Sequence, residues 1–275
     1  MGEQNHSKLN LLLSELSDGE LVSARWLRAH GYATSLVSRY VRSGWLQSPA
    51  RGVYTARNVS LTWEGVVSSL QQREGLRLHV GGRFALAWEG HQHYLPLGDV
   101  TKVTLYGPKR MPGWVDKLPM ADRLVYCRQG PFKPTTASFG GAAVDDDEAL
   151  YAEGLARQSV SSNLEVVIFA TTERAMLELC HGASSPASVY ETDALMQGLA
   201  GLRPDLVGRL LCMCTSVKAK RLFLALAERH QHAWLKRVEV GGVDLGSGKR
   251  VLVPGGRLDA KYLITLPADL GEQLG

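Results

Sequence analysis

The sequence predicts a mixed α/β fold, in which an N-terminal winged helix-turn-helix is followed by a larger mixed α/β C-terminal domain. Two observations support this. The first 60 residues hold three short stretches with helical periodicity, separated by glycines, and then two apolar stretches that can pair as strands. Strand-like and helix-like stretches then follow one another to the end of the chain, without an internal repeat.

The three N-terminal helices are predicted from periodicity and capping residues. Leucines at i, i+3, i+4 and i+7 give the first helix one apolar face, made of Leu9, Leu12, Leu13 and Leu16. Ser23 can cap the second helix, "ARWLRAH", and Gly31 can end it. Thr34 can cap the third helix, "SLVSRYVRS", which Gly44 closes. Two short helices joined by a glycine-containing turn form a helix-turn-helix.

The third helix has one apolar arc and one polar arc. At about 100° per residue, the apolar arc holds Leu36, Val37, Tyr40 and Val41. The opposite arc holds Ser35, Ser38, Arg39 and Arg42. Residues 21–60 contain no Asp or Glu. Arginine and serine can both reach base edges or phosphates, so this arc favours DNA as the partner over a merely solvated surface.

A hairpin is predicted directly after the third helix. The stretches "GWLQ" (44–47) and "GVYTA" (52–56) can pair as strands, and "SPARG" between them supplies the proline and glycine of a connection. Such a hairpin would be a wing with Arg51 near its tip. Arg25 and Arg28 on the second helix are further candidates for DNA contact, with a merely solvated face as the less favoured alternative.

The charge of the chain is concentrated at its two ends. Residues 1–60 carry 7 basic against 4 acidic side chains, residues 61–200 carry 12 against 16, and residues 201–275 carry 12 against 7. The net charges of the three segments are therefore +3, −4 and +5. This distribution suggests that the ends of the chain meet a polyanion, with ordinary solvated charge as the alternative.

The remainder of the chain predicts a mixed α/β body. Strands are expected at 76–80, 100–107, 123–128 and 164–171, and closing hairpin strands within 249–267. Helices are expected at 60–75, 171–182, 191–201, 203–214 and 216–230. Because 60–75 resembles a connecting helix, the domain division is placed between residues 1–75 and residues 76–275.

No stretch of the sequence predicts catalysis, a metal or a cofactor. The carboxylates of "DDDE" (145–148) are adjacent and do not converge, so a solvated loop or a helix start is preferred. His91 and His93 have no evident third ligand, and Cys212 and Cys214 would diverge on a helix. "DLGSGKR" (244–250) lacks the spacing of a phosphate loop and indicates a hairpin turn. A DNA-processing enzyme is therefore disfavoured.

The sequence predicts a cytoplasmic protein without a membrane span. No apolar run approaches the roughly 18 residues of a spanning helix. The first ten residues lack the basic and apolar layout of a signal peptide, and four cysteines are too few for a disulfide framework.

The whole chain resembles the AbiEi family of antitoxins from bacterial abortive-infection, or type IV toxin–antitoxin, systems. The resemblance lies in four stretches: "SRYVRSGWLQSPARGVY", "LHVGGRFALAWEGHQHYLPLG", "SVKAKRLFLALAERHQHAWLKRV" and "DLGSGKRVLVPGGRLDAKYLIT". It implies an N-terminal domain that binds inverted repeats in its own promoter and represses it. It also implies a C-terminal domain that counteracts a nucleotidyltransferase toxin, and no catalytic activity.

The resemblance gives the basic C-terminal residues a candidate role in toxin neutralisation. In the helix at 216–230, Lys218, Arg221, Glu228 and Arg229 form a narrow polar strip, and Lys220 falls on the apolar side. The candidate antitoxin residues are Lys218, Lys220, Arg221, Lys236 and Arg237. The sequence leaves open whether neutralisation requires direct contact between these residues and the toxin. The alternative is a stand-alone DNA-binding regulator of a mobile element, whose body serves for effector binding or oligomerisation.

Overall fold

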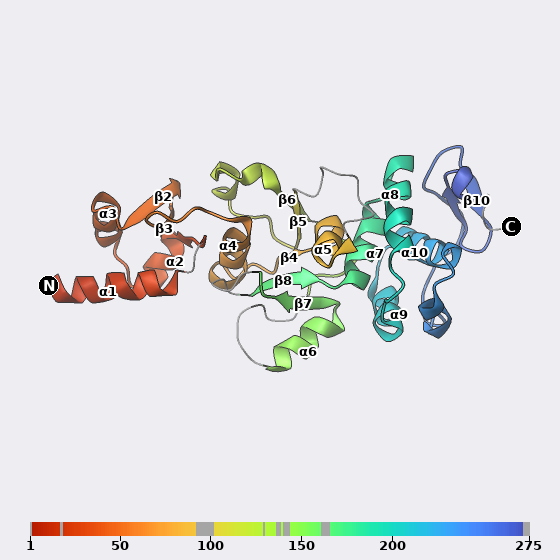
Figure 1. Cartoon of the computed structure of the whole chain (residues 1–275), viewed down its shortest axis with the longest axis horizontal. Coiled ribbons are helices and arrows are strands. Elements are labelled where there is room, and N and C mark those ends of the chain that lie inside the picture. The colour runs from red at the N-terminus through yellow and green to blue at the C-terminus, as the bar shows by residue number, and fades with distance from the viewer. Residues whose placement is uncertain are drawn as a thin grey trace.

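The computed structural model describes residues 2–16, 19–91, 102–128, 130–135, 139, 144–160 and 166–271. The chain forms an N-terminal winged helix and a larger α/β body, which lie next to each other along the longest axis of the molecule (Figure 1). The predicted fold class is therefore confirmed. No helix in these described ranges is long and apolar enough to cross a membrane.

The winged helix consists of three helices and a small sheet. Its elements are α1 (Gly2–Glu15), β1 (Val22–Ser23), α2 (Ala24–Ala29), α3 (Thr34–Arg42), β2 (Leu46–Ala50) and β3 (Val53–Ala56). The strand order is β1-β3-β2, and both pairs are antiparallel. The three helices share a core that includes Leu12, Leu27, Val37 and Tyr40. The predicted helices and hairpin are confirmed, whereas β1 was not expected.

Caps and glycines fix the ends of the short helices. The Ser23 hydroxyl accepts a hydrogen bond from the Trp26 amide at 3.0 Å, so the predicted cap of α2 is confirmed. Gly31 and Gly44 have φ angles of +77° and +71°, the left-handed conformation in which a helix commonly ends. Thr34 does not cap α3, because the helix already includes it and no side chain caps this end.

The body contains a central five-stranded sheet with helices packed against it. Its helices are α4 (Trp63–Ser68), α5 (Gly82–Trp88), α6 (Val144–Ala152), α7 (Thr172–Gly182), α8 (Pro186–Gln197), α9 (Pro204–Met213) and α10 (Val217–Arg229). The sheet strands are β4 (His79–Val80), β5 (Val103–Tyr106), β6 (Leu124–Cys127), β7 (Leu155–Gln158) and β8 (Val167–Ala170). Their order is β6-β5-β4-β8-β7, with β5–β6 and β4–β8 parallel and the other two pairs antiparallel.

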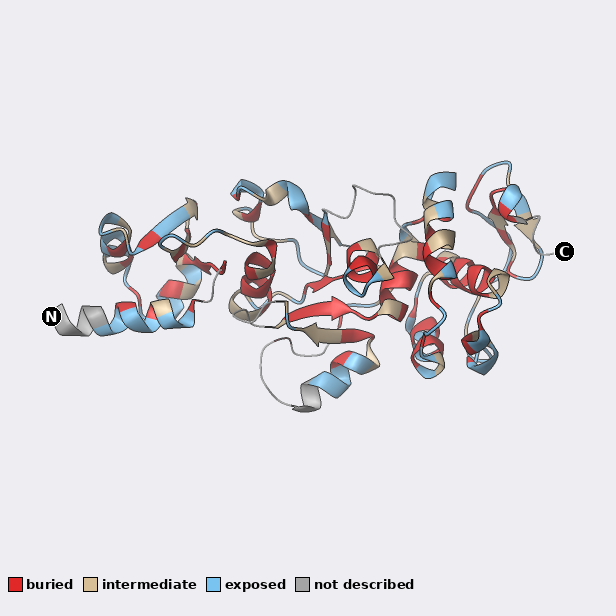
Figure 2. Ribbon diagram, in the orientation of Figure 1, coloured by how far each residue is buried: buried red, intermediate tan, exposed pale blue. Residues whose placement is uncertain are grey.

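The core of the body lies around β8, α7 and α10. All four residues of β8 are buried, and α7 contacts both α5 and α10 (Figure 2). Three short strands close the chain: β9 (Arg250–Val251), β10 (Arg257–Asp259) and β11 (Ile264–Leu266). The antiparallel pair β10–β11 confirms the predicted closing hairpin, and β9 adds to it in parallel with β11. The structure adds α5 and β7 to the predicted elements, and the acidic run at 145–148 lies in α6.

A polar seam joins the winged helix to the body. Glu20 is fully buried, and its carboxylate accepts hydrogen bonds from Ser68 and Arg73, each at 2.8 Å. Arg73 ends the π-helix Ser69–Arg73, which continues α4. A Cβ added to Gly65 of α4 would lie 2.2 Å from the Gly19 carbonyl, so the two backbones touch.

The connecting helix packs with the body. The side chains of Trp63, Val66, Val67 and Leu70 belong to the core cluster of the body, and Leu21 from the winged helix joins that same cluster. The domain division after residue 75 stays a prediction, since the core runs across this region of the chain.

Candidate nucleic-acid interface

The exposed face of α3 carries hydroxyl and guanidinium groups. Val37 and Tyr40 are buried on its other face, where they pack on α1 and α2. The exposed residues are Thr34 and the four predicted ones, Ser35, Ser38, Arg39 and Arg42. Because no acidic residue occurs between positions 21 and 60, no carboxylate of this segment offsets the positive charge of the face. A helix of this kind can donate hydrogen bonds to phosphate oxygens or to acceptors on base edges.

The wing presents Arg51 at its tip. The turn between β2 and β3 is formed by Arg51 and Gly52, with Gly52 at a φ of +81°, so it is tighter than the predicted five-residue connection. The Ser48 hydroxyl lies 2.9 Å from the carbonyl oxygens of both Ala50 and Val53 and braces the turn. The carbonyl of Gly52 also accepts a hydrogen bond from the Ala24 amide at 2.8 Å, which ties the tip to the start of α2.

Arg25 and Arg28 are exposed on α2. They lie about 60° apart around the helix axis, so both can point to the same side of the winged helix. The structure thus leaves all seven predicted DNA-contacting side chains exposed, three of them on α2 and the wing and four on α3. Their contact with DNA stays a prediction.

The polar strip expected on α10 is not a continuous surface, because Arg221 lies in the interior, as does Lys220, which was expected on the apolar side. Arg221 is 1% exposed and Lys220 is 4% exposed. The Arg221 guanidinium donates to backbone carbonyls in the segment that closes the chain: Leu245 at 2.8 Å, Gly246 at 3.0 Å, Gly248 at 2.6 Å and Leu263 at 3.0 Å. The expectation that Arg221 belongs to an exposed strip is wrong, since the 245–263 segment covers this side of the helix.

Three of these four hydrogen bonds hold the stretch "DLGSGKR" (244–250), at Leu245, Gly246 and Gly248. This stretch is a loop that leads into β9, and it is held by hydrogen bonds from the Arg221 guanidinium of α10. The Asp244 carboxylate also accepts a hydrogen bond from the Gly246 amide at 2.7 Å. The prediction of a hairpin turn here is wrong, because no strand precedes β9 within the described body segment 239–249.

The other basic candidates differ in their exposure. Lys218 is half-buried, its ammonium donates to the Ala183 carbonyl at 2.8 Å, and burial lowers its pKa. Lys236 and Arg237 are exposed on the short 3-10 helix Ala233–Arg237. Of the five predicted antitoxin residues, these two alone present their charge fully to a partner.

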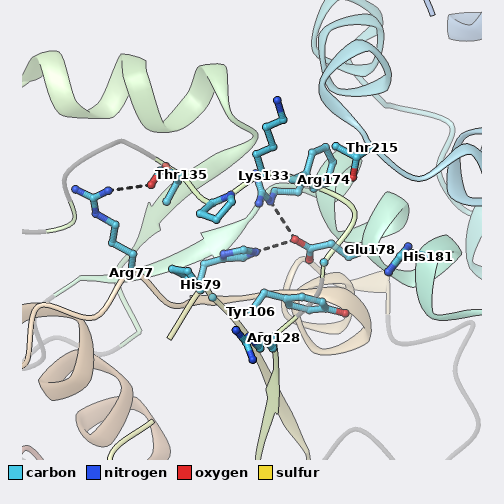
Figure 3. Close-up of a pocket in the computed structure, with 15 residues that line it drawn as sticks. Arg77, His79, Tyr106, Arg128, Lys133, Thr135, Arg174, Glu178, His181 and Thr215 are labelled. Atoms are coloured by element: carbon cyan, nitrogen blue, oxygen red, sulfur yellow. Dashed lines mark hydrogen bonds and ion pairs between the residues drawn. The ribbon is translucent and has the colours of Figure 1, made fainter. Parts of the chain in front are cut away.

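The body contains a basic pocket that the sequence did not predict. Its volume is about 370 Å³, and its cationic side chains come from three separate segments of the chain: Arg77, Arg128 with Lys133, and Arg174 (Figure 3). Arg77 precedes β4, Arg128 follows β6, and Arg174 lies on α7. Only the folded sheet brings these segments together, so no local pattern in the sequence marks the pocket.

The buried Glu178 carboxylate at the base of this pocket is hydrogen-bonded to neighbouring groups of the body. Glu178 accepts hydrogen bonds from His79 Nε2 at 2.7 Å, from Arg174 Nε at 3.0 Å and from the Gly82 amide at 3.0 Å. Burial would raise the pKa of Glu178, but His79 and Arg174 beside it hold that pKa below its ordinary value. Burial also lowers the pKa of His79, and the neighbouring Glu178 carboxylate opposes this shift.

The other side chains considered for chemistry do not converge. Asp147 of the acidic run pairs with Arg157 at 2.6 Å, Cys212 is exposed while Cys214 is buried, and His93 lies outside the described residues. Across the ranges that the structure describes, no three His, Cys, Asp or Glu side chains are grouped to hold a metal ion.

Two protein-family profiles together match nearly the whole chain. A family profile described as the N-terminal domain of the AbiEi antitoxin transcriptional regulator matches residues 5–97. A second, described as the transcriptional regulator AbiEi antitoxin of type IV toxin–antitoxin systems, matches residues 100–267. No curated protein matches the chain.

The fold has a counterpart among solved structures. The crystal structure of the RV2827C protein from Mycobacterium tuberculosis matches with a TM-score of 0.52 and 15% sequence identity, over 91% of this chain and 88% of that one. At this identity the likeness concerns the fold alone. The two family profiles, which agree with the resemblance seen in the sequence, carry the assignment. The chain belongs to the AbiEi antitoxin family, whose members are transcriptional regulators of type IV toxin–antitoxin systems.

Proposed function

We propose that this AbiEi-family regulator represses its own operon by binding inverted repeats in promoter DNA. The observation that carries the proposal is the exposed face of α3, where Arg39 and Arg42 project from a segment without acidic residues. α3 would enter the major groove, and Arg51 on the wing would reach the adjacent backbone or minor groove. The site of action would be the cytoplasm, where bacterial promoter DNA lies.

The second half of the proposal concerns a nucleotidyltransferase toxin. The body would counteract it, and the exposed cations Lys236 and Arg237 are the surface that a toxin, or an anion used by the toxin, can reach. Lys218, Lys220 and Arg221 are partly or fully withdrawn from solvent. They would support this function by holding α10 and the closing segment in place.

Arg51→Ala is expected to weaken binding to every DNA sequence by a similar factor. A wing-tip guanidinium that contacts phosphate or the minor groove adds affinity without reading a major-groove base edge. The slope of log affinity against log salt should become shallower by about one ion, measured by fluorescence anisotropy on promoter and scrambled duplexes. The control is Arg209→Ala, an exposed arginine of α9. Unchanged affinity in Arg51→Ala would mean that the wing points away from DNA.

Two double variants are expected to separate the functions in cells. Arg39→Ala/Arg42→Ala should lose repression of a promoter reporter yet still rescue growth in the presence of the toxin, because the substituted side chains lie outside the body. Lys236→Glu/Arg237→Glu should keep repression and lose rescue, because it reverses the exposed charge on the body.

The matched control for charge reversal is Lys109→Glu/Arg110→Glu, another adjacent exposed pair in the body, which should keep both activities. If every double variant loses both activities together, or if the wild-type chain rescues no nucleotidyltransferase toxin, the two-function proposal fails. A stand-alone DNA-binding regulator then takes its place.

A further inference from the structure

A second pocket, here called the C-terminal pocket, lies between the end of α10, the 3-10 helix Ala233–Arg237 and the segment that closes the chain (Figure 1). Its volume is about 720 Å³. The larger part of its lining is apolar and comes from Leu224, Leu235, Val240, Leu245 and Tyr262. A cavity of this size, with apolar walls and a few polar groups, is typical of a site for a small molecule.

The turn at the end of α10 forms one side of the C-terminal pocket. Gln231 has a φ of +51°, the left-handed conformation in which a helix commonly ends, and its amide donates to the Glu228 carbonyl at 2.9 Å. The next residue, His232, donates from Nε2 to the Met196 carbonyl at 2.7 Å, which fastens the turn to α8. Leu235 and Lys236 follow, so an apolar and a cationic side chain line the pocket next to each other.

The opposite side of the pocket is held by hydrogen bonds within the body. Arg221 donates from Nε to the carbonyl of Leu245 at 2.8 Å, and the Asp259 carboxylate accepts a hydrogen bond from the Tyr262 amide at 2.7 Å. Leu224 is 2% exposed and belongs to the core of the body. Because these walls are already ordered, little conformational entropy is lost when a ligand binds between them.

The polar groups of the C-terminal pocket leave one positive charge without an acidic partner. Glu228 is the one acidic side chain among its described lining residues, and it accepts hydrogen bonds from Lys261 Nζ at 2.6 and 2.7 Å and from the Tyr262 hydroxyl. Burial lowers the pKa of His232, so this imidazole adds no charge at neutral pH. Lys236 is exposed and forms no ion pair with any side chain that the structure describes.

We propose that the C-terminal pocket binds a small amphipathic anion, a compound with an apolar body and one anionic group. The apolar body lies against Leu224, Leu235 and Leu245, where it is removed from water. The anionic group pairs with Lys236 at the rim, where no carboxylate competes for the ammonium. The proposal needs neither DNA nor a toxin and therefore does not rest on the proposed function.

Two fluorescent compounds that share one ring system test the proposal: 8-anilinonaphthalene-1-sulfonate and its neutral counterpart N-phenyl-1-naphthylamine. Titrations of the full chain at about 0.15 M salt should give one binding site per chain, with the sulfonate bound more tightly. Lys236→Met should lower the affinity for the sulfonate by at least roughly threefold and change that for the neutral compound by less than about twofold. The matched control is Lys117→Met, an exposed lysine outside the pocket, which should bind both compounds as the wild type does.

Val240→Asp probes the apolar wall of the pocket independently of Lys236. Val240 is 45% exposed, so the variant should fold normally and keep its thermal unfolding temperature. A carboxylate at this position makes the wall polar and repels an anion, so the affinity for both compounds should fall. Decanoate should displace the sulfonate from the wild-type chain at lower concentration than decanol does, because decanol has the same chain length without the charge.

Three results would overturn the proposal. The first is the absence of saturable binding of the sulfonate to the wild-type chain. The second is an equal loss of affinity in Lys236→Met and Lys117→Met, which would show a general effect of charge. The third is displacement of the sulfonate by a blocked Asp-Trp-Asp tripeptide at lower concentration than by decanoate, which would assign the pocket to an acidic protein segment. Since neither promoter DNA nor a toxin enters these measurements, their failure is distinguishable from a failure of the proposed repressor and antitoxin activities.

Discussion

Replacing both Arg39 and Arg42 with alanine is expected to abolish specific binding to promoter DNA while leaving the fold intact. Each arginine contact with a base or phosphate contributes about 1–3 kcal/mol, so loss of the pair should lower the affinity by at least roughly thirtyfold. Both side chains are exposed at the end of α3, and the core of the winged helix uses Val37 and Tyr40 instead. Thermal unfolding should therefore be unchanged.

Electrophoretic retardation of promoter DNA is the direct measurement. The control is Arg110→Ala/Arg209→Ala, which removes the same amount of charge from exposed positions of the body and should retain specific binding. Retardation that survives in Arg39→Ala/Arg42→Ala would show that α3 is not the recognition helix.

Arg221→Met should be among the most destabilising single substitutions in the body. Methionine preserves much of the apolar volume but leaves four backbone carbonyls without the donors that Arg221 gives them at 2.6–3.0 Å. The loss of these charge-assisted hydrogen bonds from a buried side chain costs free energy, and we expect a loss of about 3–5 kcal/mol in the free energy of unfolding. Urea denaturation followed by circular dichroism gives the value.

Arg209→Met on the neighbouring helix α9 is the matched control, because that arginine is exposed. Its effect should stay within about 0.5 kcal/mol, as is usual for surface positions. A loss below about 1 kcal/mol in Arg221→Met would mean that water or other donors replace the guanidinium. The closing segment would then be held mainly by the apolar contacts of residues such as Ile264 and Leu266.

Local signals predicted the winged helix well because its elements begin and end at residues with strong conformational preferences. Ser23 caps α2 through its own hydroxyl, and Gly31 and Gly44 adopt the left-handed conformation that ends a helix. The apolar and polar arcs of α3 also follow from helical geometry alone. Nothing local marked β1, because Val22 and Ser23 become a strand only by pairing with Val53 and Tyr54 some thirty positions later.

The body was predicted less completely because its packing depends on distant segments. Helical angles correctly place Arg221 and Lys218 near each other on α10, but they do not show that the 245–263 segment covers Arg221. The basic pocket was missed for the same reason. Arg77 and Arg174 lie almost a hundred positions apart in the sequence, and only the fold of the sheet and α7 brings both to the lining of one pocket.

The polar seam between the winged helix and the body restricts the orientation of the winged helix relative to the body. Gly65 packs against the backbone of Gly19, and Glu20 accepts hydrogen bonds from Ser68 and Arg73. Because of these contacts, the winged helix has little freedom to rotate independently of the body. A rotation of α4 would be passed through Gly19 and Glu20 to the winged helix that carries α3. In the proposed complex with DNA, the body would therefore set the orientation of α3 in the groove, and a shift among the body helices would change the contacts of α3 with DNA.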